Sequence, residues 1–114
     1  MNYPKYEAIE ICKRFNVQVE FPFPQEKVGI ALVTLHLLPL NAVRHKAENG
    51  TCGWYIWGGG TLHQDPDFFQ PIHVSHLDEY VPGIQKYLAL PAGWRVLLAP
   101  NYEDVWFDES LLAP

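Results

Sequence analysis

Three histidines close together in this sequence could do chemistry. His63, His73 and His76 lie within fourteen residues, and imidazole is a common zinc ligand and general base. Zinc sites on helices favour histidines at positions i and i+4, whereas His73 and His76 straddle an expected strand-to-helix junction. We therefore interpret them as hydrogen-bonding histidines and expect no metal and no cofactor. A small metal- or ligand-binding, enzyme-like domain that uses them near a glycine-rich loop is the alternative.

The sequence does not show the residue patterns typical of a nucleophilic serine or cysteine or of a catalytic carboxylate pair. The sequence has no G-x-S-x-G elbow, and Cys12 and Cys52 fall on expected apolar faces, where cysteine is normally an inert hydrophobe. Paired carboxylates could act as acid and base, but most fall in expected loops or strand ends, where acids are usually solvated. We expect no catalytic residue and no enzyme. The acid pairs are Asp65 and Asp67, Asp78 and Glu79, Glu103 and Asp104, and Asp108 and Glu109.

The stretch CGWYIWGGG raises the question of a phosphate loop. Phosphate loops place spaced glycines before a helix, as in G-x-x-x-x-G-K-[ST]. Gly58, Gly59 and Gly60 are followed by Thr61-Leu62-His63, with neither a lysine nor a helical pattern. We predict a bend at the end of a strand.

Acidic residues are concentrated in the second half of the chain. The net charge is −5 over 114 residues. Residues 61–114 hold eight acids against Lys86 and Arg95 alone. Phosphate backbones require clustered Lys and Arg, so we expect no direct nucleic-acid partner. A basic protein surface is the natural complement.

The chain length and the order of the patterns predict one α+β domain spanning residues 1–114, with a mostly antiparallel sheet. Apolar spacing predicts an N-terminal helix over residues 4–15. A kinked or split helix is expected near residues 76–88, capped by Ser75 and interrupted at Pro82. Alternating or β-branched runs predict strands over residues 17–21, 28–34, 42–47, 52–57, 94–99 and 105–107.

Asn49-Gly50 is the clearest local signal. Both residues tolerate positive φ, so they predict a hairpin turn between strands 42–47 and 52–57. In the second strand Trp54 and Ile56 face one side of the sheet, while Tyr55 and Trp57 face the other. Either this strand is covered on both sides, or one aromatic face is open to a partner.

No apolar run is long enough to cross a membrane, and the N-terminal stretch lacks a signal-peptide pattern. We therefore expect a cytoplasmic protein with reduced thiols and no membrane partner.

Short motifs from residue 53 onward are more specific than these patterns. They are GWYIW at 53–57, DPDFF at 65–69, PIHV at 71–74, LALP at 88–91, GWR at 93–95 and YEDVW at 102–106. Together they resemble a family of bacterial immunity proteins that neutralise polymorphic toxins, the immunity protein thirty-three-like domains. The likeness covers about half of the chain and supports the family more than any particular site.

The resemblance implies a cytosolic protein that binds a cognate protein toxin and blocks it by occlusion. Acidic loops would suit a toxin that acts in the cytoplasm and has a basic cleft. Aromatic side chains, which dominate binding hot spots, would anchor the interface, Trp54, Tyr55 and Trp57 among the candidates. The expected partner-binding residues are Asp65, Asp67, Phe68, Phe69, Tyr102, Glu103, Asp104, Trp106 and Asp108.

Overall fold

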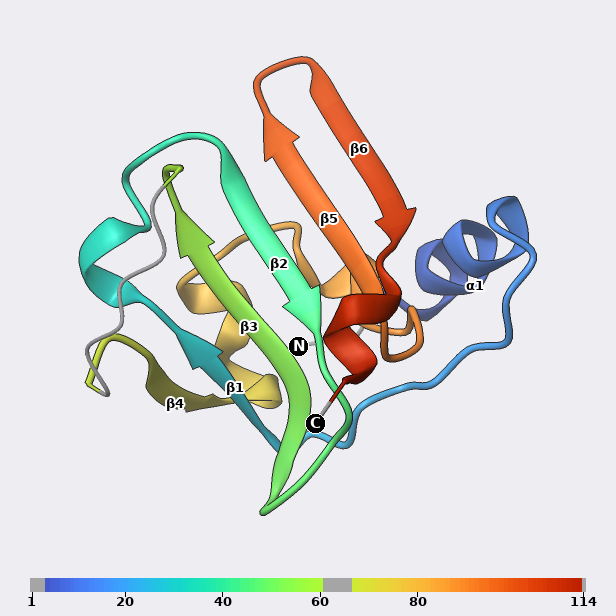
Figure 1. The fold of residues 1–114 in the computed structure, drawn as a ribbon, viewed down its shortest axis with the longest axis horizontal. Helices are drawn as coiled ribbons and strands as arrows, with labels where there is room; N and C mark the ends of the chain where they lie inside the picture. Colours follow the sequence, from blue (N-terminus) through green and yellow to red (C-terminus); the bar gives the residue numbers. More distant parts are fainter. Residues whose placement is uncertain (1–3, 61–66, 114) are drawn as a thin grey trace.

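The computed structural model describes residues 4–60 and 67–113 and has one helix packed beside a twisted six-stranded sheet (Figure 1). The α+β expectation is therefore confirmed. The helix is α1 (Lys5–Arg14), and the strands are β1 (Lys27–Ile30), β2 (Leu40–Arg44), β3 (Thr51–Gly58), β4 (Gln70–His73), β5 (Trp94–Ala99) and β6 (Tyr102–Phe107). Short 3₁₀ turns are η1 (Leu32–Thr34), η2 (Val74–Glu79), η3 (Gln85–Tyr87) and η4 (Glu109–Leu112). None of the described helices is long and apolar enough to span a membrane.

Helix α1 forms where the apolar spacing predicts it. Ala8, Ile11 and Cys12 lie on one face and are buried in the larger hydrophobic core, where α1 contacts η3. Asn16 follows the helix with a left-handed φ of 58°. Asparagine tolerates this conformation better than most residues, which explains why the helix ends here.

The β2–β3 hairpin is confirmed. Asn49 and Gly50 have φ values of 53° and 81°, and the Thr51 N–H donates to the Glu48 carbonyl at 3.0 Å. Both central residues therefore adopt the positive φ that a type I′ turn requires.

The strand order is β4-β1-β3-β2-β5-β6. Among the pairings of the described strands, only β1–β3 is parallel, and the other four are antiparallel. Side chains alternate between two faces of the sheet. We call the face toward α1, η2 and η3 the inner face and the opposite one the outer face. Trp54 and Ile56 are fully buried on the inner face, whereas Trp57 and Val43 belong to a second, smaller cluster on the outer face.

The glycine triplet is a bend, as expected. A Cβ on Gly58 would lie 2.1 Å from the Thr34 carbonyl oxygen, so only glycine allows the two backbones to approach. Gly59 has a φ of +85°, a conformation that other residues rarely adopt.

The predicted strand at 17–21 is wrong. In this segment, Glu20 donates its N–H to the Ala89 carbonyl at 2.8 Å and accepts a hydrogen bond from Arg44 Nη1 at 2.8 Å. The backbone is thus tied to the turn after η3 rather than to a strand. The alternating pattern arose because Val17 and Phe21 pack against the inner-face core.

Other boundaries also differ from the prediction. The run 28–34 divides into β1 and η1, and the split helix consists of η2 and η3, which are 3₁₀ turns. Ser75 lies inside η2 and does not cap it, because the residue before η2 is His73. Strand β4 was missed because it contains Pro71, which the sheet tolerates only because β4 is an edge strand.

Replacing Arg44 with Met should lower the free energy of unfolding by about 3 kcal/mol, because buried carbonyl oxygens would lose their donor. Arg44 is 6% exposed and donates to the carbonyls of Glu20, Cys52, Leu88 and Leu90 at 2.8–3.0 Å. Urea denaturation measures the change. Lys46→Met, which removes an exposed cation from the adjoining turn, is the control and should change stability by less than about 0.5 kcal/mol. Equal effects from both variants would contradict this role for Arg44.

Candidate functional site

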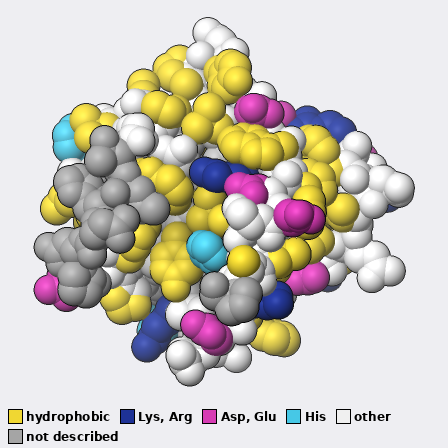
Figure 2. All heavy atoms as spheres, viewed as in Figure 1, with side chains coloured by type: hydrophobic (Ala, Val, Ile, Leu, Met, Phe, Trp, Pro, Cys, Tyr) yellow, Lys and Arg dark blue, Asp and Glu magenta, His cyan; other side chains and the backbone are white. Residues whose placement is uncertain are grey.

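The outer face of the sheet gathers most of the residues that the sequence singles out. Figure 2 views this face and shows hydrophobic side chains across its centre, with cationic, acidic and histidine side chains among them. The inner face, by contrast, is covered by α1 and by the segment that contains η2 and η3. The described elements thus cover the outer face of the sheet less than the inner face.

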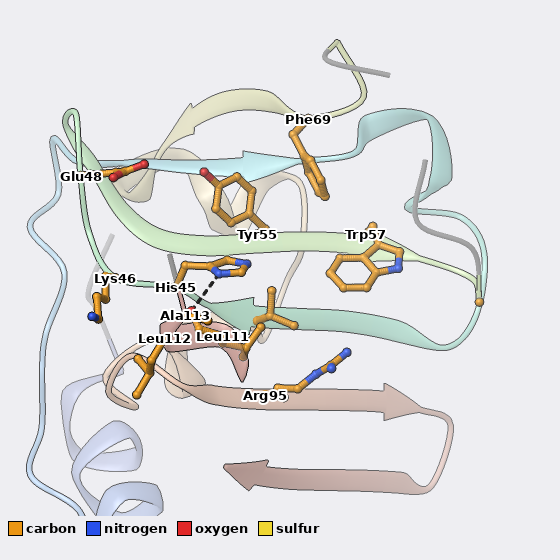
Figure 3. Close-up of a pocket in the computed structure, with 12 residues that line it drawn as sticks. His45, Lys46, Glu48, Tyr55, Trp57, Phe69, Arg95, Leu111, Leu112 and Ala113 are labelled. Atoms are coloured by element: carbon orange, nitrogen blue, oxygen red, sulfur yellow. Dashed lines mark hydrogen bonds between the residues drawn. The ribbon is translucent and has the colours of Figure 1, made fainter. Parts of the chain in front are cut away.

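A groove of about 860 Å³ crosses the outer face. Figure 3 shows Tyr55 and Trp57 from β3 along it, with Phe69 on one side and Leu111 and Arg95 on the other. The volume lies within the range of about 300–1,000 Å³ typical of ligand pockets. Its further lining residues are Val43, His45, Lys46, Glu48, Gly60, Leu112 and Ala113.

Aromatic rings shape one wall of the groove. The Tyr55 and Phe69 rings meet edge to face at 5.2 Å between centroids, and Trp57 and Phe69 do so at 6.2 Å. Tyr55 lies across Gly29 of β1, where an added Cβ would be only 2.5 Å from Tyr55 Cδ1. Gly29 therefore makes the space that lets the Tyr55 ring lie flat beside the neighbouring strand.

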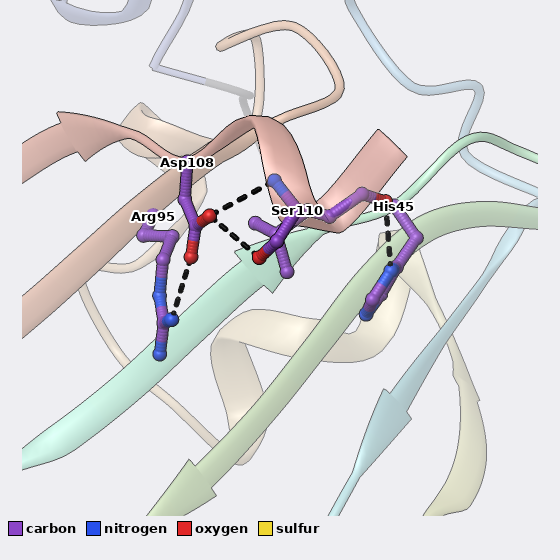
Figure 4. Close-up of polar contacts among 5 residues, drawn as sticks. His45, Arg95, Asp108 and Ser110 are labelled. Carbon is purple, nitrogen blue, oxygen red and sulfur yellow. Dashed lines mark hydrogen bonds and ion pairs between the residues drawn. The ribbon is translucent and has the colours of Figure 1, made fainter. Parts of the chain in front are cut away.

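A polar cluster holds the opposite wall (Figure 4). Arg95 Nη1 donates to Asp108 Oδ2 at 3.0 Å, and Asp108 Oδ1 accepts from the backbone and the hydroxyl of Ser110. The Ser110 hydrogen bonds, followed by Arg95, lower the pKa of Asp108. The Trp106 ring lies 5.3 Å from Arg95 Cζ and adds a cation–π contact. Asp108 thus has two roles, since it caps the start of η4 and also orients the Arg95 side chain.

The final turn η4 is also fixed from the sheet. His45 Nδ1 lies 3.1 Å from the Leu111 carbonyl oxygen and donates to it when that nitrogen carries the proton. Leu111 is 9% exposed and packs with Val43 and Trp57. These contacts keep η4 against the outer face and form the second side of the groove.

The structure brings only some of the expected partner-binding residues together. Tyr102, Asp104 and Trp106 alternate along β6 and share the outer face with Arg95, the pairing partner of Trp106. Phe69 lines the groove, whereas Phe68 is 8% exposed and belongs to the core beneath it. Asp67 is exposed, and Asp65 lies outside the described residues.

Glu103 lies on the inner side of β6, away from its sequence neighbours. Its carboxylate accepts hydrogen bonds from Arg14 Nη2 at 2.7 Å and from the Tyr87 hydroxyl. The Tyr87 hydrogen bond, followed by Arg14, lowers the pKa of Glu103, whereas burial and Glu103 raise the pKa of Tyr87. Glu103 therefore joins α1 and η3 to β6 and has a structural role.

Sequence reasoning did not select Arg95, His45 or Leu111 as site residues. The usable signal for Arg95 was its place in a strand. It alternates with the buried Val96, and it is one of only two cations after residue 60. A charged residue on the outer face of β5 is not needed to fill the core, so its presence there suggests another role.

The family model of the Imm33-like domain matches residues 7–108. This chain belongs to the Imm33-like domain family. Comparisons with curated proteins and with solved structures found no significant match. The resemblance noted from the motifs is thus confirmed, and the match reaches well beyond the half of the chain that carries them.

In this Imm33-like domain the histidines of the alternative hypothesis are not gathered into a ligand set within the part that the structure describes. His73 and His76 are exposed with ring centroids 6.3 Å apart, and His76 Nδ1 lies 3.0 Å from Glu79 Oε2. His63 lies outside the described residues. Across residues 4–60 and 67–113, no group of three or more His, Cys, Asp or Glu residues could hold a metal ion.

The two cysteines are buried in the inner-face core of the Imm33-like domain. Burial raises the pKa of both thiols, and the nearby Arg44 opposes the rise only in part. Since the thiolate is the nucleophilic form, this environment favours an inert side chain.

Replacing Glu103 with Gln should lower the free energy of unfolding by on the order of 1 kcal/mol at pH 7, since the pair is partly exposed. Because folding lowers the Glu103 pKa, its contribution is present above the ordinary value of 4.5 and is lost as pH falls below it. The gap between the variant and the parent should therefore narrow below pH 4.5. Urea titrations at several pH values measure this.

Asp104→Asn is the matched control, since it changes an adjacent exposed acid on the other side of β6. It should leave stability within about 0.5 kcal/mol of the parent across the same pH range. A constant gap for Glu103→Gln, from neutral to acid pH, would contradict the account of the ion pair.

Proposed function

We propose that this protein is a cytoplasmic immunity protein that binds a cognate bacterial toxin and neutralises it by occlusion. The observation that carries the proposal is the match to the Imm33-like domain over residues 7–108. Neutralisation by occlusion requires binding and no chemical step, and the described residues provide a groove on an open face that suits this task.

The outer face is the proposed docking surface. It combines a groove with aromatic walls and the exposed outer side of the edge strand β6. Protein–protein hot spots favour buried Trp, Tyr and Arg surrounded by contacts that exclude water. Tyr55, Trp57 and Arg95 provide these residue types at the centre of the face, and Tyr102 and Trp106 extend them along β6.

Acidic residues would guide association. Asp67 and Asp104 are exposed, and the chain carries a net charge of −5. A toxin that acts on nucleic acid in the cytoplasm needs a basic cleft, and opposite charges accelerate the encounter of two proteins. Covering that cleft with the outer face would block the toxin without any chemical step.

The direct test is co-expression with the protein encoded by the neighbouring gene, in cells that the neighbour alone kills. Growth should be restored, and the two proteins should co-purify as a stable complex. A neighbour that is not toxic, or a toxin that forms no complex with this chain, would refute the proposal.

Replacing Tyr102 with Ala should weaken toxin binding by on the order of 1–2 kcal/mol, about tenfold in Kd, because an exposed aromatic anchor is lost. Tyr6→Ala is the matched control, since Tyr6 is 76% exposed on α1 and Tyr102 is 53% exposed on β6. Calorimetric titration of the toxin measures both. A larger loss for Tyr6→Ala would place the interface on the inner side of the molecule.

Replacing Asp104 with Lys should slow association with the toxin by on the order of tenfold at low salt, and the difference should shrink as salt screens the charges. Glu7→Lys makes the same charge change on an exposed residue of α1 and should have a smaller effect. Stopped-flow association at several ionic strengths separates the two. Equal slowing by both variants would show that only net charge matters.

A further inference from the structure

Strand β6 is an edge strand whose outer side has no partner among the described strands. It ends the strand order β4-β1-β3-β2-β5-β6, and Figure 1 shows it at one margin of the sheet. An edge strand carries N–H and C=O groups that no neighbouring strand satisfies, so it can accept an additional strand from another chain. The free edge of β6 is therefore a place where a partner could extend the sheet.

The pairing with β5 identifies the backbone groups that lie at this edge. The Asp108 N–H donates to the Gly93 carbonyl at 2.7 Å, so the backbone N–H of Asp108 faces β5. The register of β6 on β5 is regular along the whole strand, and successive residues of an antiparallel strand direct their backbone groups to alternate sides. Counting back from Asp108, the N–H and C=O groups of Glu103, Val105 and Phe107 point away from β5.

The two edges of the sheet differ in their capacity to pair. The opposite edge strand, β4, has four residues and contains Pro71, which has no N–H. Short strands and prolines are common means of preventing edge-to-edge association. Strand β6 has six residues, YEDVWF, without proline or lysine, and its register on β5 has no bulge. Of the two edges, β6 is the one suited to accept a further strand.

Acidic side chains on β6 determine which strand it can accept. Asp104 is exposed and makes no ion pair with any described residue, whereas Glu103 is paired with Arg14. Opposite charges directly across two strands stabilise their pairing, and like charges destabilise it. An added strand is therefore favoured when it carries Lys or Arg opposite Asp104.

A second copy of this chain fits the edge poorly. Pairing of two β6 strands would bring Glu103 and Asp104 of both copies to one strand pair, and two chains of net charge −5 repel each other. A basic segment avoids this repulsion. It would also find apolar surface at the two ends of the edge, because Tyr102 is 53% and Phe107 49% exposed.

We propose that β6 is a docking strand, and that an extended basic segment of the toxin pairs with its free edge and continues the sheet. Backbone hydrogen bonds to Glu103, Val105 and Phe107 hold the segment, and a Lys or Arg of the segment lies opposite Asp104. This inference rests on the proposed function and takes the toxin as the partner. It adds the mode of binding, which is strand addition at one edge of the outer face.

Hydrogen exchange of the protein alone tests whether the edge is free. The amides of Val105 and Phe107 should exchange at least about tenfold faster than those of Asp104 and Trp106, which donate to β5. Exchange of Val105 and Phe107 as slow as that of Asp104 and Trp106 would show that the edge is already satisfied and would overturn the inference. A dimer in solution with these amides protected would assign the edge to a second copy instead.

Three synthetic peptides test the chemistry of the edge without the toxin. A blocked hexapeptide of alternating valine and lysine should shift and protect the amides of Glu103, Val105 and Phe107. Its valine–glutamate counterpart should bind at least about fivefold more weakly, because like charges would lie across the strands. A valine–lysine peptide N-methylated at every peptide bond keeps the charges but cannot donate backbone hydrogen bonds, and it should not bind the edge.

Two pairs of variants locate the interaction. Val105→Pro removes an N–H from the edge and should abolish peptide binding, whereas Val105→Ala also loses core packing but keeps the N–H and should bind. Asp104→Asn should reduce the preference for the basic peptide, and Glu7→Gln, which neutralises an exposed acid on α1, should leave it unchanged. Thermal denaturation checks that each variant is folded.

The peptides decide the matter on the unaltered protein even if Val105→Pro does not fold. Equal binding of the methylated and unmethylated basic peptides would show that charge alone acts. Equal binding of the acidic and basic peptides, or no effect of any peptide on β6, would also overturn the inference.

A last arm uses the toxin itself. Toxin binding should slow exchange of the Glu103, Val105 and Phe107 amides at least about tenfold. If the toxin binds and these amides exchange as before, strand addition fails while the immunity function stands. If the toxin does not bind the parent protein, the immunity function fails, and the peptides still decide whether the edge accepts a basic strand.

Discussion

The buried guanidinium of Arg44 is the interaction on which the rest of the fold depends. It sits at the end of β2 and donates to the carbonyls of Glu20, Leu88 and Leu90, which belong to irregular segments. The Trp54 indole N–H donates to the same Leu88 carbonyl at 2.9 Å. Buried carbonyls need donors, and these two side chains supply them where no strand does. The irregular segments around Glu20 and Leu88–Leu90 are thereby held against the inner face of the sheet.

Closing one face in this way leaves the other available. Strand β3 carries Trp54 on the closed side and Tyr55 and Trp57 on the open side. Residues of neighbouring elements then position the side chains on the open side. Gly29 makes room for Tyr55, and Asp108 orients Arg95 while starting η4. The groove is therefore assembled from β2, β3, β5, η4 and the segments between them, and no single motif in the sequence encodes it.

Features that depend on residues close together in the sequence were predicted correctly. Asn49-Gly50 fixed the hairpin turn, Ala8, Ile11 and Cys12 gave α1, and the alternation of Trp54 with Tyr55 assigned two faces. The strand predicted at 17–21 was wrong because its backbone partners are Arg44 and Ala89, which are distant in sequence. Glu103 looked equivalent to Asp104, and only the register of β6 separates the residue held by Arg14 from the one on the open face. Arg95 was overlooked because its role depends on groups from other strands.

The central claim is that the outer face binds the toxin, and the four tryptophans test it directly. Trp57 and Trp106 lie on the outer face, whereas Trp54 and Trp94 pack in the inner-face core. The decisive measurement is the indole N–H spectrum of the labelled protein with and without the toxin. The account predicts large shifts for Trp57 and Trp106 and small ones for Trp54 and Trp94. Shifts confined to Trp54 and Trp94, with Trp57 and Trp106 unchanged, would contradict it.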